Sequence, residues 1–86
     1  MENRDRLVSS FSEINLKDYK MPIICIFSSP TDYPEMYVAR VFDVDKPTNN
    51  ILMRTNLEAI RSEIPNGFSL VQRSSSDDPK VVETWI

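Results

Sequence analysis

The chain has 86 residues, which is enough for one small domain with a single hydrophobic core. Its hydrophobic fraction of 41% and charged fraction of 27% are ordinary globular values, so extensive disorder is excluded. The net charge of −3 disfavours a protein that binds a phosphate backbone, because such proteins concentrate positive charge. We therefore expect one folded domain over residues 1–86 that binds no nucleic acid.

The compartment is indicated by the single cysteine and by the N-terminal sequence. Cys25 cannot form an internal disulfide, which fits a reducing environment. The first residues are charged and lead into no apolar run of the kind found in a secretory signal. No stretch approaches the ~20 apolar residues of a membrane span. We expect a cytoplasmic protein without a membrane partner.

Two residue types that often support catalysis are scarce in this sequence. Histidine, the commonest general base and metal ligand, is absent, and Gly67 is the only glycine, so no glycine-rich phosphate loop can be written. Cys25 lies between Ile24 and Ile26 with no histidine to activate it, which predicts an inert core thiol. We expect no catalytic residue and no cofactor. An enzyme would have to work with Asp, Glu, Tyr or Lys alone.

The first twenty residues have the spacing of a helix followed by a connector. Residues 4–15 place apolar side chains at the helical positions Leu7, Val8, Phe11 and Ile14. Several serines lower the helix propensity of the same stretch. A mobile N-terminal arm is therefore the competing interpretation of residues 1–20.

Residues 21–86 form the predicted core, organised around the stretch 22–27. This stretch contains no polar side chain and is bounded by prolines, which is typical of a strand covered on both faces. The stretch 36–44 alternates as a second strand, with Arg40 on one face and Tyr37 on the other. Residues 45–50 have the composition of a turn, and 51–54 returns as a third strand of the hairpin.

A helix over residues 56–64 is the best-supported local element. Thr55 and Glu58 fit a capping box, and three apolar residues line one helix face. Pro65 and Gly67 then end the helix. Residues 68–73 and 81–86 read as two further strands, separated by a polar loop over residues 74–79.

These elements predict an α+β fold in the order α-β-β-β-α-β-β, with one mixed or antiparallel five-stranded sheet. The preferred strand order is 51–54, 36–44, 22–27, 81–86, 68–73; the alternative exchanges the last two strands. A five-stranded sheet is about 24 Å wide, whereas a helix of residues 56–64 is about 14 Å long. Apolar sheet surface therefore needs further cover, either from the helix over residues 4–15 or from self-association.

Acidic residues give the only candidates for a metal site, and we expect none to bind one. Asp43 and Asp45 form an Asp-x-Asp pair at a strand end, but a calcium loop there would place Pro47 and Arg54 at ligand positions. Glu83 shares a strand face with Trp85 and is expected to form a surface ion pair with Arg40 or Arg73.

Amphipathic aromatic residues provide the remaining functional signal. Tyrosine, tryptophan and arginine are the residue types that carry most interface energy. They predict a contact surface, with ordinary packing of the sheet as the competing explanation, at Tyr33, Tyr37, Arg40 and Trp85. The leading hypothesis is a small non-catalytic domain that acts through protein contact or as a weak homodimer. The alternative is a small-molecule or peptide binder with a pocket near Tyr37, Arg40 and Trp85.

Overall fold

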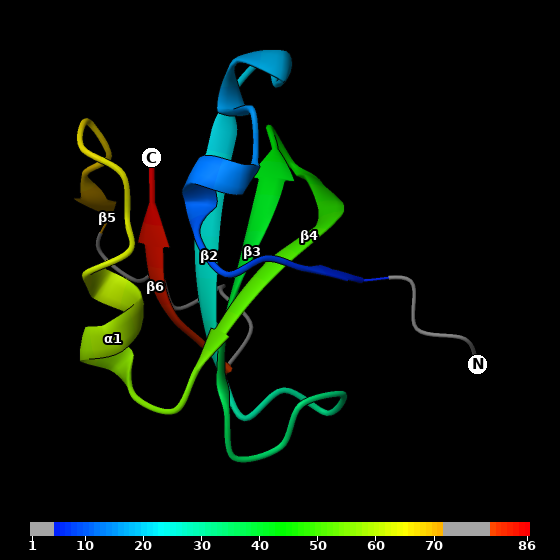
Figure 1. The fold of residues 1–86 in the computed structure, drawn as a ribbon, viewed down its shortest axis with the longest axis vertical. Helices are drawn as coiled ribbons and strands as arrows, with labels where there is room; N and C mark the ends of the chain where they lie inside the picture. Colours follow the sequence, from blue (N-terminus) through cyan, green and yellow to red (C-terminus); the bar gives the residue numbers. More distant parts are fainter. Residues whose placement is uncertain (1–4, 72–79) are drawn as a thin grey trace.

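A six-stranded mixed sheet carries the fold, and one α-helix packs against it within the residues described by the computed structural model, 5–71 and 80–86 (Figure 1). The strands and helices are β1 (Arg6–Leu7), β2 (Pro22–Ser28), β3 (Tyr37–Asp43), β4 (Lys46–Arg54), α1 (Leu57–Arg61), β5 (Leu70–Val71) and β6 (Val81–Trp85), with 3-10 helices η1 (Phe11–Glu13) and η2 (Leu16–Asp18). No helix in the described parts of the chain is long and apolar enough to cross a bilayer.

The sheet has the strand order β1-β4-β3-β2-β6-β5. All neighbours are antiparallel except β1 and β4, which pair in parallel. The preferred order of the five predicted strands is confirmed. Strand β2 lies in the interior of the sheet because its apolar run provides no polar face for solvent. The predicted count of five strands is wrong, since β1 adds a sixth strand at the β4 edge.

The predicted N-terminal helix over residues 4–15 is wrong. The described part of this stretch contains β1 and the single turn η1. Local capping explains the difference. The Ser10 hydroxyl accepts a hydrogen bond from the Ser12 amide, and the Glu13 carboxylate accepts from the amides of Ser9 and Ser10. This capping box starts a new helical turn at residue 10 and prevents a continuous helix through it.

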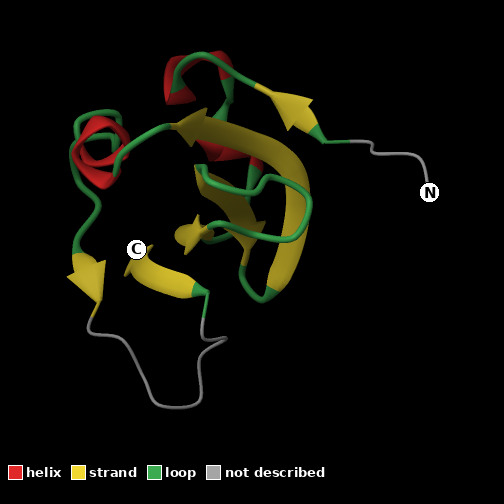
Figure 2. Ribbon diagram, turned by 90° about the horizontal axis from the view of Figure 1, so that it is seen from below, coloured by secondary structure: helices red, strands yellow, loops and turns green. Residues whose placement is uncertain are grey.

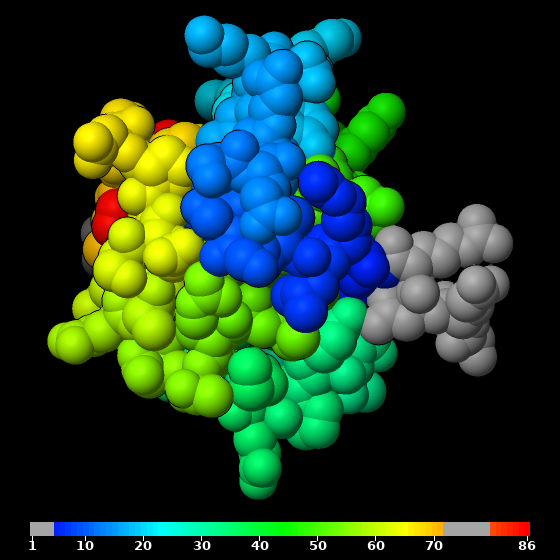
Figure 3. All heavy atoms as spheres, in the orientation of Figure 1, coloured from blue at the N-terminus to red at the C-terminus, as the bar shows by residue number. Residues whose placement is uncertain are grey.

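The N-terminal segment nevertheless supplies the cover that the sheet requires. Val8, Phe11 and Ile14 are buried in the main hydrophobic core. The helical spacing therefore marked three of these buried residues although the backbone is not an α-helix, but it also included Leu7, which is 59% exposed. Figure 3 shows this segment, in blue, lying across the front of the molecule beside the yellow segment that follows α1.

Helix α1 is shorter than the predicted 56–64 and has a different cap. Asn56, not Thr55, caps it, and the Asn56 Oδ1 accepts from the Ala59 amide at 2.8 Å. After Arg61 the chain continues in tighter turns with bonds of the 3-10 type, because residues that precede Pro65 disfavour the α conformation. Gly67 then adopts a φ of 100°, which favours glycine.

Strand β4 begins at Lys46, so the predicted turn over residues 45–50 is wrong. The reversal instead occurs at Val44, with a φ of 60°, and Asp45. The polar residues of β4 are accommodated by an irregularity opposite β3, where the Thr48 hydroxyl donates to the Val41 carbonyl at 2.6 Å. Figure 2 shows how strongly β4 bends around the sheet.

The C-terminal strands are shorter than predicted. β5 is Leu70–Val71 and β6 is Val81–Trp85. The remainder of the predicted strand 68–73 and the predicted polar loop 74–79 include residues 72–79, which lie outside the described ranges.

The two faces of the sheet are covered by different parts of the chain. The face with Ile24 and Ile26 packs against the N-terminal segment and α1; we call it the core face. The opposite face carries the buried residues Val38 and Ile51, and we call it the second face. Pro30, from the β2–β3 loop, lies beside Val38 on this second face. In β2, Ile24 and Ile26 on the core face are buried, whereas Ile23, Cys25 and Phe27 on the second face are half-buried, so the predicted cover is complete on the core face only.

Candidate functional sites

The four predicted contact residues are divided between the two faces. Tyr37 and Trp85 pack against the hydrophobic core on the core face, where Trp85 lies opposite Ile24. Arg40 lies on the second face, and Tyr33 reaches the same place from the β2–β3 loop. The structure therefore brings Tyr33 and Arg40 together and places Tyr37 across the sheet from Arg40. A single pocket around Tyr37, Arg40 and Trp85 is incompatible with this alternation.

Arg40 and Tyr33 meet at the carboxylate of Asp5. The Arg40 guanidinium donates from Nη1 to Oδ1 and from Nη2 to Oδ2, both at 2.9 Å, and the Tyr33 hydroxyl donates to Oδ2 at 3.0 Å. Arg40 Nη1 also donates to the Thr48 carbonyl at 2.9 Å. We call Asp5, Arg40 and Tyr33 the Asp5 trio. Its geometry is the bidentate fork by which arginine recognises planar carboxylates.

The Asp5 carboxyl is held in its ionised form. The hydrogen bond from Arg40 lowers the pKa of Asp5, and the Tyr33 hydrogen bond and the positive charge of Arg40 act in the same direction, against a smaller rise from burial. The Asp5 side chain is 13% exposed and that of Arg40 is 22% exposed. The trio is therefore screened from water without being fully enclosed.

A cavity of about 170 Å³ adjoins the Asp5 trio. Arg40 and Tyr33 line it together with the apolar residues Phe27, Pro30 and Val38, and Asp32 lies at its exposed rim. The two donors that hold Asp5 thus also face an apolar hollow. Apolar walls with a few convergent polar groups are the usual composition of small-ligand sites.

A second carboxylate, Glu83, is held by an arginine and an aromatic residue on the core face. Glu83 is only 5% exposed, and Arg61 from α1 donates from Nε to its Oε2 at 2.8 Å with a further contact from Nη2. The Trp85 Nε1 donates to the other oxygen at 3.1 Å. The bond to Glu83 raises the pKa of Arg61. We call these residues the Glu83 trio.

The predicted surface pair of Glu83 with Arg40 or Arg73 is wrong for Arg40, and Arg73 lies outside the described residues. Glu83 pairs with Ile26 across the sheet, on the core face, whereas Arg40 pairs with Cys25 on the second face. Glu83 is also buried. The trio fastens α1 to β6, which is a structural role.

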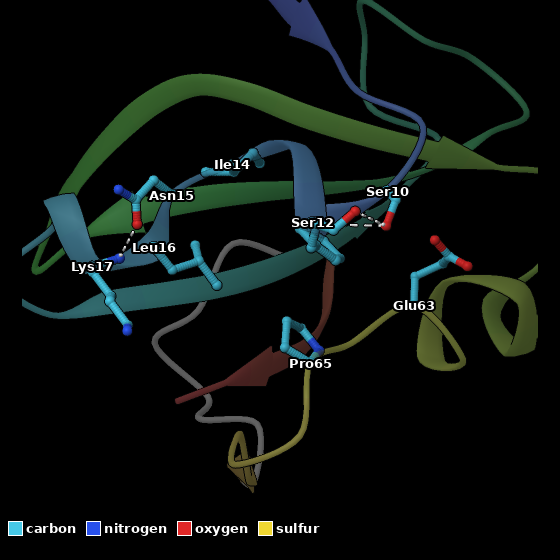
Figure 4. A pocket seen from close by; sticks show the side chains of 9 residues that line it. Ser10, Ser12, Ile14, Asn15, Leu16, Lys17, Glu63 and Pro65 are labelled. Carbon is cyan, nitrogen blue, oxygen red and sulfur yellow. Dashed lines mark hydrogen bonds between the residues drawn. The ribbon is translucent and has the colours of Figure 1, made fainter.

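Two pockets lie along the seam between the N-terminal segment and the segment that follows α1. The first part of this seam groove has a volume of about 430 Å³ and is lined by Ser10, Phe11, Ser12, Ile14, Asn15, Leu16, Lys17, Glu63 and Pro65. Figure 4 shows Leu16 and Pro65 near its middle, with Lys17 and Glu63 at opposite ends. The Glu63 carboxylate is paired with Arg54 at 3.4 Å.

The second part of the groove lies further along the same two segments. Its volume is also about 430 Å³, and it is lined by Lys20, Met21, Pro22, Asn66, Gly67, Phe68 and Ile86. Met21 and Ile86 are about half exposed, at 49% and 46%. We call the two parts together the seam groove.

The seam groove combines an apolar floor with positive charge. Neither Lys17 nor Lys20 forms an ion pair with a residue in the described ranges. The chain as a whole carries a net charge of −3. The charged residues that line the groove are thus these two lysines and Glu63, whose carboxylate is paired with Arg54.

The other candidate residues have structural surroundings. Asp43 accepts a hydrogen bond from the Met21 amide at 3.1 Å, and Cys25 is half-buried with its sulfur 3.9 Å from the Thr84 hydroxyl. Among residues 5–71 and 80–86 there is no group of three or more acidic or cysteine side chains placed to hold a metal ion.

Comparison of the chain with protein-family models, with curated protein sequences and with solved structures finds no match.

Asp5 and the seam groove were not among the sequence-predicted site residues. Asp5 reaches Arg40 only because β1 adds in parallel to β4, and nothing in the local sequence indicates that pairing. The groove arises where two segments of irregular backbone meet. The exposed apolar residue Met21, directly before the β2 run, was the available signal.

Proposed function

We propose that this protein is a non-catalytic domain that binds an extended peptide segment of a partner protein in the seam groove. The observation that carries the proposal is the apolar floor of the groove, in which Met21 and Ile86 are about half exposed, bordered by two lysines without ion-pair partners among the described residues. Apolar side chains exposed together, unlike single ones, mark interaction sites.

The shape of the seam groove supports an extended partner. Its two parts follow one another between residues 10–22 and residues 63–68, and each has the size of a typical ligand pocket. An extended chain can place alternate side chains into successive hollows, as peptides do in other recognition grooves.

The charge of the groove supports an acidic partner. Lys17 and Lys20 lie on the same side of the seam, at its N-terminal border. Complementary charge at an interface favours the correct partner and accelerates association. We therefore propose a segment with apolar side chains for Leu16, Met21 and Phe68 and with aspartate or glutamate beside the two lysines.

The test is selection from a random peptide library displayed on phage, followed by titration of the selected peptides. We expect apolar peptides with acidic residues, whose affinity falls at least tenfold in the Met21→Glu variant and in Lys17→Glu/Lys20→Glu. Leu7→Glu is the matched control, because Leu7 is also an exposed apolar residue but lies at the β1 edge.

Two results would overturn this proposal. Peptides that bind wild type and Met21→Glu equally well do not use the groove. Sedimentation that shows a dimer disrupted by Met21→Glu would assign the groove to a second copy of the chain instead.

A further inference from the structure

We infer that Arg40 and Tyr33 form a binding site for a small organic monocarboxylate with an apolar body, and that Asp5 occupies the site as an internal substitute. The inference concerns the second face and is independent of the seam groove. It depends on the geometry of the Asp5 trio and on the adjoining cavity.

The first argument is that the same two donors serve the carboxylate and line the cavity. A bidentate arginine with a tyrosine hydroxyl offers three hydrogen bonds to one carboxylate, all of 2.9 to 3.0 Å here. A structural ion pair requires no hollow beside it. This one adjoins about 170 Å³ bordered by Phe27, Pro30 and Val38.

The volume indicates the kind of apolar body that fits. An apolar cavity of about 150 Å³ holds a benzene molecule. The hollow beside Arg40 therefore accommodates a phenyl ring or a branched aliphatic group of similar size. Asp32 at its rim disfavours a second negative charge by repulsion. A monocarboxylate is thus favoured over a dicarboxylate.

Asp5 is placed where it can leave the site. β1 contains only Arg6 and Leu7, both exposed, at the edge of the sheet. Arg6 donates from Nη1 to the Asn50 Oδ1 at 3.1 Å, and the chain enters the core at Val8, which is 2% exposed and whose amide donates to the Ile51 carbonyl at 2.9 Å. Release of residues 5–7 would remove the Asp5 carboxylate from Arg40 and Tyr33 while the core remains packed.

Asp5 and an external carboxylate would compete for the same donors, and this competition can be measured. A tethered group competes at an effective concentration in the millimolar range. The apparent affinity for an external carboxylate is then the intrinsic affinity multiplied by the fraction of molecules in which Asp5 has left the site. Removing the charge of Asp5 should therefore strengthen binding, although the substitution adds no contact to the ligand.

The experiment is an NMR titration with benzoate as the probe. We expect Asp5→Asn to bind benzoate at least about tenfold more tightly than wild type, with shifts at Tyr33, Val38 and the Arg40 side chain. The Asp45→Asn control removes an exposed turn carboxylate and should bind like wild type. Benzamide has the same ring without the charge and should not bind.

A second pair of variants tests the arginine fork. In the Asp5→Asn background, Arg40→Lys should reduce benzoate affinity at least tenfold, since lysine cannot form the bidentate contact. Arg54→Lys should leave it unchanged. Benzamide binding as tightly as benzoate, or full affinity in Arg40→Lys, would overturn the inference.

The wild-type protein provides a measurement that does not depend on how Asp5→Asn folds. Increasing benzoate should shift the Arg6 and Leu7 amides and speed their hydrogen exchange, because β1 is released. Val8 should remain protected. Absence of any shift at Arg40 and Arg6 up to roughly 50 mM benzoate, tens of times a millimolar effective concentration, would also overturn the inference.

Discussion

The Asp5 trio and the Glu83 trio use nearly the same chemistry on opposite faces of one sheet. Each joins a carboxylate to an arginine and to an aromatic donor, a tyrosine hydroxyl in one and an indole N–H in the other. In the Glu83 trio the acid is the buried member, and it belongs to the interior strand β6. In the Asp5 trio the acid belongs to the short segment at the sheet edge.

This difference decides what each trio can do. A carboxylate fixed in the core cannot be rehydrated without opening the core, so the Glu83 trio contributes to global stability. A carboxylate beside an edge strand can be rehydrated by a local movement. Similar hydrogen-bonding groups thus contribute to global stability on the core face and form a contact that can open locally on the second face.

The largest expected effect is that of Glu83→Ala. This substitution leaves the Trp85 N–H without its partner and opens a small cavity, so we expect a loss of about 2–3 kcal/mol of unfolding free energy. Urea denaturation followed by Trp85 fluorescence measures it. Glu58→Ala is the control, because Glu58 is exposed on α1 and should cost only a few tenths. Equal losses of unfolding free energy for the two variants would mean that the contacts of Glu83 do not stabilise the fold.

The cap of α1 sharpens the comparison because this helix carries Arg61. Asn56→Ala should cost about 1 kcal/mol by removing the hydrogen bond to the Ala59 amide. Thr55→Ala should stay within about 0.5 kcal/mol. A larger loss of unfolding free energy for Thr55→Ala than for Asn56→Ala, measured by the same denaturation, would support the predicted capping box at Thr55.

Asp5→Ala should have a smaller and local effect. The trio is partly open to water, so we expect at most about 1 kcal/mol in unfolding free energy. Hydrogen exchange at Arg6 and Leu7 should nevertheless accelerate, while Ile24 and Leu52 amides remain protected. Acceleration throughout the core would place Asp5 in the same class as Glu83.

Lowering the pH is expected to have the smallest effect that distinguishes the Asp5 trio from the Glu83 trio. The folded pKa of Asp5 lies below its ordinary value of 3.8, so the ionised, paired form stabilises the fold above that value. This contribution is lost as pH falls through the folded pKa. We expect the Arg6 and Leu7 amide signals to be constant from pH 7 to 5 and to change only below about pH 4. In Asp5→Asn that acid transition should be absent, and its persistence would assign it to another carboxyl group.

Much of the sheet could be predicted from hydrophobic pattern alone. The unbroken apolar run of β2 required an interior position, and a short connection made β3 one of its neighbours. The hairpin of the last two strands was placed on the other side of β2, with β6 preferred over β5 as the neighbour and the reverse left open. The N-terminal segment shows where this reasoning ends. Apolar residues spaced as Val8, Phe11 and Ile14 fit a helix, yet they also fit a strand followed by a short turn. Which one forms depends on the competing caps at Ser10 and Glu13.

The sites were harder to predict than the fold because their partners are distant in sequence. Tyr33 and Arg40 were predicted as surface residues, but Asp5 is 35 positions from Arg40 and reaches it through parallel pairing. Glu83 was assigned the wrong arginine because strand alternation alone does not relate the faces of two strands. That relation follows from the register of β6 on β2, which includes an irregularity after Ile26.

The short edge strands have a consequence for the protein at high concentration. Exposed edges of a sheet can pair with another chain and start aggregation. Here β1 and β5 each present two residues within the described ranges, and the free part of β4 contains Lys46 and Pro47. Charge and proline both discourage the addition of a strand. Within the described residues, the edges of the sheet therefore offer little length for another chain to pair with, while the apolar floor of the seam groove stays accessible.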